Sequence, residues 1–153
     1  MGTRRKSREL ALQMLFQSDM AGQNSDEVRR TFWAERKNVG SDVRGFADDL
    51  FRVAHDRAEE INKLIERHAE HWRMERMATV DRNILRGGVA EFLAYPATPK
   101  AVIRSFSALI SSAAARSPTI AAILSGVVDF TLAAMAAKAS AQLAGFSLPL
   151  TRT

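Results

Sequence analysis

Four cationic side chains stand within five positions near the start of the chain, at Arg4, Arg5, Lys6 and Arg8, directly before an apolar segment with helical spacing. Cations at a helix N-terminus oppose the helix macrodipole, which costs about 0.3–1 kcal/mol for each exposed charge. A phosphate backbone would compensate, because each contact releases condensed counterions and the guanidinium group matches phosphate oxygens. The segment is therefore either a nucleic-acid contact or a solvated helix end.

One side of this predicted helix can collect the polar residues of the segment. Arg4, Arg8 and Gln13 are spaced so that they can project together, while leucine and methionine side chains pack inward. Phe16 fits either the core or a stacking surface for an unpaired base. The candidate nucleic-acid-binding residues are Arg4, Arg5, Lys6, Arg8 and Gln13.

The composition is that of one globular domain with a basic balance. The chain has 153 residues, of which 46% are hydrophobic and 25% charged, and its net charge is +5 with a pI near 10.2. That charge favours polyanionic partners. The absence of cysteine excludes disulfides, thiolate nucleophiles and cysteine zinc sites, and it fits a reducing compartment. The polar residues that follow the basic start argue against a secretory signal.

Catalytic and metal-binding chemistry has little support in the residue pattern. The histidines are His55, His68 and His71, and the spacing of the last two is not that of the helical zinc-protease motif, so we expect surface side chains. No glycine-rich phosphate loop follows a predicted strand, and no nucleophile, base and oxyanion donor come together. We therefore expect a protein that is not an enzyme and that holds no metal or cofactor.

The elements that must position these residues have the helical period. Apolar residues recur at three- and four-residue steps over 41–70, which predicts one long amphipathic helix with Ser41 as its N-cap. The same pattern over 74–93 predicts another helix, which ends at the proline-containing segment 95–99. No segment alternates with period two, so the prediction is an all-α fold of six or seven helices.

Two further helix starts are predicted at Thr98-Pro99 and at Ser117-Pro118, where a capping hydroxyl precedes a proline at the first helical position. Residues 120–137 are mostly apolar and approach the length of a membrane span. Asp129 would cost about 2.5–3.5 kcal/mol near the centre of a bilayer, which favours a buried core helix. No membrane partner is expected.

Motifs in order along residues 4–130 resemble the transcription antitermination protein NusB family. The basic start reads RRKSRELALQMLFQ and is similar to the family's arginine-rich opening helix. The segment VDRNILRGGVAEFL at 80–93 is similar to another helix of the family, in which an acid and a basic residue precede I-L-R. The proline-containing linker YPATPKAVI at 95–103 and the segment SGVVD at 125–129 are similar to a family connection and to its closing motif.

The resemblance implies two packed three-helix groups and a non-catalytic function. NusB-like proteins pair with the small-subunit ribosomal protein that doubles as NusE, and the pair binds the single-stranded boxA element of nascent RNA. This helps to load an antitermination complex on RNA polymerase over ribosomal RNA operons, which implies a cytoplasmic location. Carried onto this sequence, the RNA-binding segment falls on Arg4, Arg5, Lys6 and Arg8, and the NusE surface on Phe16 and Asp81, with Arg82 and Arg86 nearby. Asp81 could instead cap the helix that follows it.

The resemblance weakens after residue 103. Arg104 and Ser105 stand where the family commonly has Asn-Glu, and Thr119 and Ile123 stand where relatives that contact RNA have an acid and an aromatic residue. This departure puts a second RNA-contacting patch in doubt. The segment is either native but divergent or the product of a reading-frame error. We divide the chain into a NusB-like domain at 1–138, divergent over 103–138, and an irregular tail at 139–153.

Two alternatives belong to other functional classes. A similar fold forms the RNA-binding accessory domain of some ribosomal RNA cytosine methyltransferases. The apolar segment would also suit a structural helical adaptor.

Overall fold

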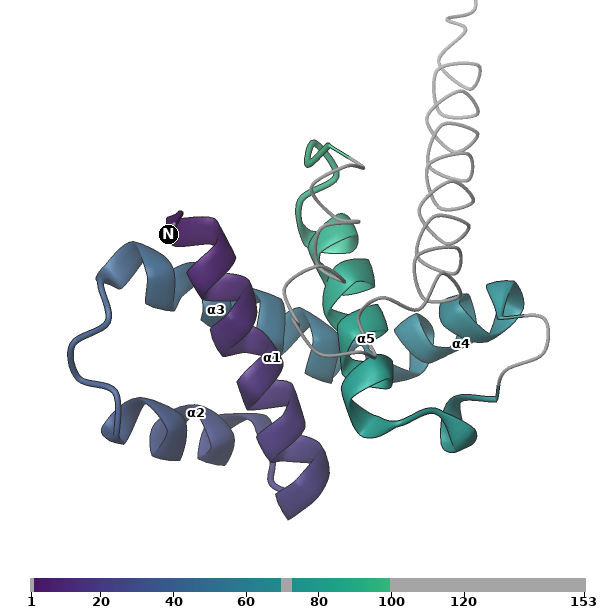
Figure 1. The fold of residues 1–153 in the computed structure, drawn as a ribbon, viewed down its shortest axis with the longest axis horizontal. Helices are drawn as coiled ribbons and strands as arrows, with labels where there is room; N and C mark the ends of the chain where they lie inside the picture. Colours follow the sequence, from purple (N-terminus) through teal and green to yellow (C-terminus); the bar gives the residue numbers. More distant parts are fainter. Residues whose placement is uncertain (1, 70–72, 100–153) are drawn as a thin grey trace, which may run out of the picture.

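The computed structural model describes residues 2–69 and 73–99, and every regular element within these two ranges is helical. The elements are α1 (Thr3–Ala21), α2 (Ser25–Ala34), α3 (Ser41–Asp56), α4 (Ala58–His68), a 3-10 turn η1 (Met74–Arg76) and α5 (Thr79–Ala94) (Figure 1). The prediction of an all-α fold is confirmed.

Several predictions concern segments outside the described residues. These are the helices that start after Thr98-Pro99 and Ser117-Pro118, the apolar segment 120–137, the divergent segment 103–138 and the tail at 139–153. Among the helices that the structure describes, none combines the length and the apolar character needed to cross a membrane.

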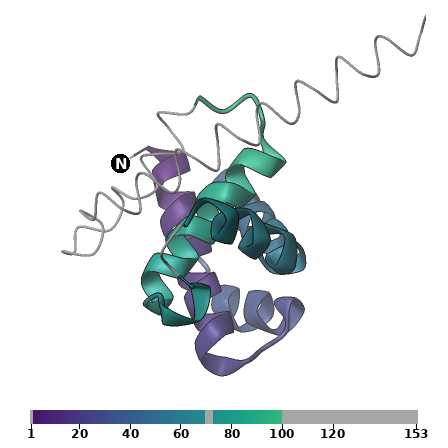
Figure 2. The same cartoon turned by 90° about the vertical axis from the view of Figure 1, so that its right-hand side faces the viewer.

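Helices α1, α3 and α5 form the centre of the described structure. α1 packs against α3 and α5, and α3 also packs against α5 (Figures 1 and 2). The side chains at this centre are almost fully buried, and they include Met14 from α1, Leu50 and Phe51 from α3, and Ile84 and Leu85 from α5. Each helix therefore turns the apolar stripe seen in its sequence toward one shared core.

Two local signals produce the turn from α1 into α2. Gly22 ends α1 with a φ of 61°, and its N–H donates to the Ser18 carbonyl at 2.9 Å. Glycine adopts this left-handed conformation without a steric penalty. The Asn24 side chain then accepts a hydrogen bond from the Glu27 N–H at 2.9 Å, which caps α2. Asn24 and Glu27 stand at capping-box spacing, a sequence signal for a helix that periodicity alone did not indicate.

The single helix predicted over 41–70 is wrong, because the chain forms α3 and α4 instead. Arg57 interrupts it with φ −106° and ψ 23°, and α4 starts at the next residue. The Arg57 N–H donates to the Val53 carbonyl while its own carbonyl accepts from the Ile61 N–H, so the helices follow without a loop. The apolar spacing continues across the break, which is why periodicity does not reveal it. The N-cap prediction is also wrong, because Gly40 holds that position and Ser41 is the first helical residue.

The prediction over 74–93 is confirmed in part. Residues 74–76 form η1, and the regular helix α5 begins only at Thr79 and ends at Ala94. Its C-cap is Tyr95, as the break at 95–99 predicts. Asp81 does not cap α5, because the N-cap is Ala78 and Asp81 lies within the first turn.

Candidate nucleic-acid and partner interfaces

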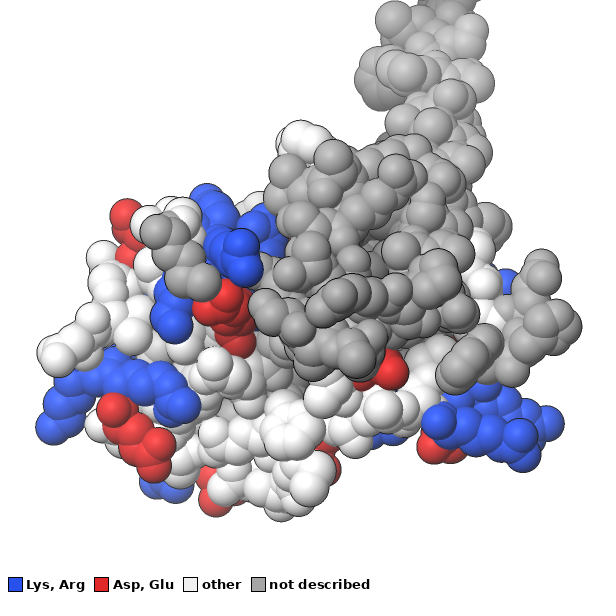
Figure 3. Space-filling model, viewed as in Figure 1, with Lys and Arg blue, Asp and Glu red and all other residues white. Residues whose placement is uncertain are grey.

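Arg4, Arg5 and Lys6 form an exposed cluster on the first turn of α1, which we call the basic turn. Arg5 and Lys6 both lie near the Glu9 carboxylate, at 3.6 and 3.8 Å. Figure 3 shows blue side chains gathered around this end of α1. The first turn of α1 contains no acidic residue, so the helix dipole adds to the positive charge of the three side chains.

Arg4 is held in place by an aromatic ring. Its guanidinium carbon lies 3.9 Å from the centroid of the Phe46 ring on α3, a cation–π contact. The Phe46 ring in turn packs against the Tyr95 ring at 4.9 Å, and the Tyr95 hydroxyl donates to Asp49 at 3.0 Å. Burial and this bond to the Asp49 carboxylate raise the pKa of Tyr95, so the phenol stays neutral.

Arg8 does not share the exposure of the basic turn. Arg8 is only 6% exposed, and its guanidinium forms a bidentate ion pair with the Glu91 carboxylate on α5. The Arg8 Nε donates to Glu91 Oε2 at 2.7 Å, and Nη2 donates to Oε1 at 2.5 Å. Glu91 is fully buried. The structure therefore separates Arg8 from the three exposed cations with which it was grouped.

An apolar groove opens toward the other end of α1, between α1, α2 and the start of α5. It has a volume of about 400 Å³ and is lined by Leu12, Gln13, Phe16, Gln17, Phe32, Arg36, Val80 and Asn83. Phe16 is 41% exposed, which is unusual for so large an apolar side chain. The Arg36 guanidinium stacks on the Phe32 ring at 3.9 Å. Gln13, which was grouped with the cations, lies here beside Phe16.

Arg82 and Arg86 converge on one acidic residue of α1 that the sequence did not single out. Asp19 accepts from Arg82 at 3.1 Å, from Arg86 at 3.2 Å and from the Asn83 amide at 3.2 Å. Burial lowers the pKa of Arg86, although Asp19 acts in the opposite direction. Since Asn83 also lines the groove, this cluster fixes the groove wall on α5 to the last turns of α1.

Asp81 lies next to the groove residue Val80, and its buried Oδ1 atom has no hydrogen-bond partner among the residues that the structure describes. Within residues 2–69 and 73–99, the buried Nε atom of Arg82 likewise has no partner. Desolvation by burial raises the pKa of Asp81 above its ordinary value of 3.8. Unpaired buried groups cost stability and are rare in folded proteins, so two neighbouring ones mark this turn of α5 as a candidate binding site.

Asp81→Asn is expected to increase the free energy of unfolding at pH 7 by about 0.5 kcal/mol, because the lost desolvation penalty outweighs the lost interaction with the helix dipole. A raised folded-state pKa means that folding favours the protonated carboxyl. The contribution of the Asp81 carboxyl to the free energy of unfolding is complete below pH 3.8 and is lost as the pH rises through the folded-state pKa. The advantage of the asparagine variant should therefore shrink as the pH falls from 7 toward 4. Urea unfolding at several pH values measures it, and a gain that is constant with pH would contradict the explanation.

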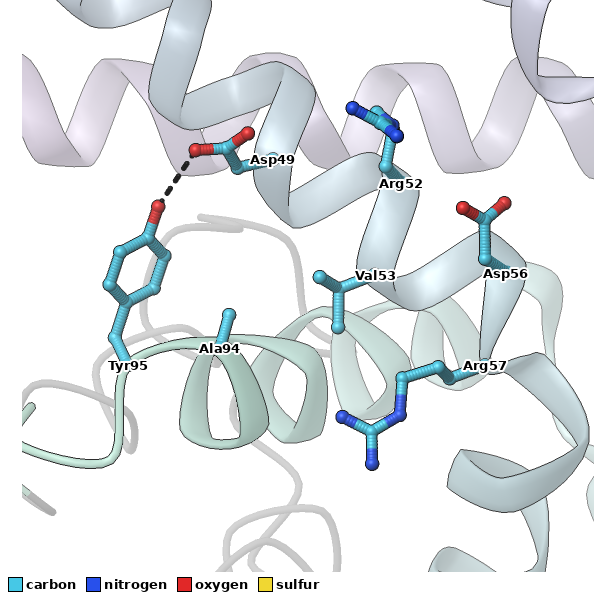
Figure 4. Close-up of a pocket in the computed structure, with 7 residues that line it drawn as sticks. All are labelled: Asp49, Arg52, Val53, Asp56, Arg57, Ala94 and Tyr95. Carbon is cyan, nitrogen blue, oxygen red and sulfur yellow. Dashed lines mark hydrogen bonds between the residues drawn. The ribbon is translucent and has the colours of Figure 1, made fainter.

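A second hollow of about 490 Å³ lies between α3 and the end of α5 (Figure 4). It is lined by Asp49, Arg52, Val53, Asp56, Arg57, Ala94 and Tyr95. Charges of both signs alternate on its rim, and the Arg57 guanidinium is bound to Glu60 at 2.7 Å. This hollow therefore has no excess of positive charge for a phosphate. Within residues 2–69 and 73–99, no three His, Asp or Glu side chains are grouped so as to hold a metal ion.

The sequence is similar to a known protein family. Residues 5–132 match the model of the NusB family. The transcription antitermination protein NusB of Koribacter versatilis is 62% identical over 128 residues, which cover 84% of this chain and 87% of that protein. The NusB protein of Myxococcus xanthus is 41% identical over 67% of this chain and 75% of its own length.

Solved structures have the same fold. A chain in a crystal structure of the antitermination factors NusB and NusE in complex with dsRNA has a TM-score of 0.73 and 26% identity, and the match covers 84% of this chain and 98% of that one. The solution structure of NusB from Aquifex aeolicus has a TM-score of 0.72 and 26% identity, over 88% and 93%. With its arginine-rich opening helix and a family match that spans most of its length, this chain belongs to the NusB family.

Proposed function

We propose that this protein is a transcription antitermination factor that binds boxA-type single-stranded RNA together with ribosomal protein NusE and promotes transcription of ribosomal RNA. The observation that carries the proposal is the presence of two chemically different surfaces on one helix, in a chain that is 62% identical to a NusB protein. One surface is the basic turn and the other is the apolar groove. A polyanion fits the first and a protein fits the second.

The basic turn supports an RNA contact. Its three cations are exposed, and they sit where unpaired N–H groups of the helix terminus also favour an anion. The Arg4 guanidinium lies over the Phe46 ring, and its N–H groups can still donate to phosphate oxygens. RNA contact by Gln13 is less well supported, because Gln13 lines the groove.

The apolar groove supports a protein contact. Exposed aromatic side chains that border a concave apolar surface are typical anchors for a partner chain. Phe16 provides such a ring, and the unpaired polar atoms of Asp81 and Arg82 lie next to the same wall. Phe16 and Arg4 are twelve residues apart on α1, which corresponds to about 18 Å of helix. NusE and RNA could therefore bind together without competing for the same atoms.

A non-catalytic, cytoplasmic role follows from this proposal, because the protein would act on nascent RNA beside RNA polymerase. The relatives carry the name of an antitermination protein, which does not favour the methyltransferase accessory domain or the structural adaptor.

The test is a reconstitution with purified protein, NusE and a boxA-type RNA. We expect a ternary complex on size-exclusion chromatography, and we expect NusE to tighten RNA binding in a fluorescence anisotropy titration. Annealing the complementary strand to the same RNA provides the matched comparison of single-stranded with double-stranded RNA. Failure to bind either RNA in the presence of NusE would refute the proposal.

Arg4→Ala is expected to weaken RNA binding by about fivefold and to reduce the slope of log affinity against log salt by about 0.7, the value for one phosphate contact on a single strand. Anisotropy titrations at several salt concentrations measure both. The matched control is Arg30→Ala, which removes an exposed cation of α2 and changes the net charge equally. An equal loss in both variants would show that net charge alone, and not the basic turn, attracts RNA.

A further inference from the structure

We infer that the buried Arg8–Glu91 ion pair positions the basic turn for RNA, and that Arg8 itself does not contact RNA. This inference rests on the proposed function and assigns a role to two residues within it. Arg8 belongs to the arginine-rich start by sequence, but its contacts place it in the interior of the fold.

The start of α1 has little intrinsic support as a helix end. Its N-cap is Gly2, with no side-chain hydrogen bond, and its first turn contains no acid. The three cations of the basic turn oppose the helix dipole. A helix end of this kind frays unless tertiary contacts hold it. The first such contact with a distant charged partner is the pair between Arg8 and Glu91, which are 83 positions apart.

The geometry connects this pair to Arg4. The guanidinium carbons of Arg4 and Arg8 lie 3.9 and 5.9 Å from the centroid of the same ring, Phe46. Arg8 is buried at the edge of the core, and Arg4 lies one helical turn nearer to the N-terminus. Glu91 therefore fixes Arg8 to α5, Phe46 packs beside Arg8 from α3, and Arg4 lies over the same ring. Tyr95 supports the ring, at 4.9 Å.

Direct RNA contact by Arg8 would require the pair to open. Glu91 is fully buried and both of its oxygens accept from Arg8, so withdrawal of the guanidinium would leave an uncompensated carboxylate in the core. That is among the least favourable changes that a protein interior can undergo. A fixed basic turn, in contrast, loses little conformational entropy when RNA binds, which favours affinity.

The Glu91→Gln variant distinguishes a positioning role of Arg8 from direct RNA contact, because the two roles predict opposite changes in RNA affinity. If Arg8 positions the basic turn, the variant loosens that turn, and RNA binding weakens by about fivefold, equal to about 1 kcal/mol. If Arg8 contacts RNA, the variant frees one cation and raises the net charge by one, so RNA binding stays equal or tightens and its salt dependence becomes steeper.

NusE binding to the groove provides the control for folding, because a general loss of structure would weaken NusE binding as well. We expect NusE affinity to stay within about twofold, since the groove lies toward the other end of α1.

The double variant Arg8→Gln/Glu91→Gln decides the question if Glu91→Gln does not fold. Two amides can hydrogen-bond to each other and leave no buried charge. The inference predicts that the double variant binds RNA more tightly than Arg8→Gln alone, with the salt slope of the unsubstituted protein. Binding as weak as that of Arg8→Gln, with a slope lower by about 0.7, would overturn it.

If the unsubstituted protein binds no RNA, the proposed function fails and this inference fails with it. If it binds RNA and Glu91→Gln binds equally well, only the inference fails.

Discussion

Phe16→Ala is expected to weaken NusE binding by about 30-fold, equal to about 2 kcal/mol, which is the usual effect of removing an aromatic anchor from an interface. Phe16 lines the apolar groove and is 41% exposed, so its ring is available to a partner before binding. Because much of the ring is already in water, the free energy of unfolding should fall by only about 0.5–1 kcal/mol. Isothermal titration calorimetry with NusE and urea unfolding measure the two effects separately.

Met20→Ala is the matched control. Met20 lies one helical turn further along α1 and is 67% exposed, but it does not line the groove. Its removal takes away a similar apolar surface and should change NusE affinity by no more than about threefold. Equal losses for Phe16→Ala and Met20→Ala would mean that the whole exposed face of α1, and not the groove, binds NusE. No loss for Phe16→Ala would place the partner elsewhere.

Asp48→Ala should lower the free energy of unfolding by about 3 kcal/mol, because it removes a buried charged acceptor and leaves a buried indole N–H without a partner. The Trp33 Nε1–H donates to Asp48 at 2.8 Å, and the Arg29 Nε donates to the same oxygen at 3.1 Å. These bonds join α2 to α3. The hydrogen bond from Arg29 to Asp48 is also the main reason why the pKa of Arg29 is raised. Thermal unfolding should show a decrease in Tm of about 10 °C.

Two variants separate the parts of this effect. Asp48→Asn keeps an oxygen for the indole N–H and loses only the charge, so we expect about half of the destabilisation. Asp26→Asn removes another carboxylate near Arg29, at 3.6 Å, but that side chain is 95% exposed. Exposed pairs contribute little, so its cost should stay below about 0.5 kcal/mol. A large effect of Asp26→Asn would show that the charge around Arg29, and not the buried contact between Trp33 and Asp48, accounts for most of the destabilisation.

The helical class, the opening helix and the cations at its start can all be recognised from the amino-acid sequence alone. Helical periodicity depends on residues three and four positions apart, so it can be recognised without any knowledge of tertiary contacts. The end of α5 at Tyr95 is also a local signal, because the prolines that follow it disfavour further helix. Family motifs at 4–17 and 80–93 added the expected partners. The capping pair Asn24 and Glu27 was an available local signal for α2.

The packing of the helices determines which of these residues come into contact. Arg8 carries the same charge as the three cations before it, although its spacing from Ala11 and Leu15 is that of the buried face of α1. Its partner Glu91 lies 83 positions away, so local patterns do not reveal what neutralises it. Gln13 and Phe16 share a groove with Val80 for a similar reason. Asp19 became the common acceptor for Arg82 and Arg86 only when α1 packed against α5. Burial and long-range pairing depend on how helices pack, and a pattern of neighbours along the chain does not contain that information.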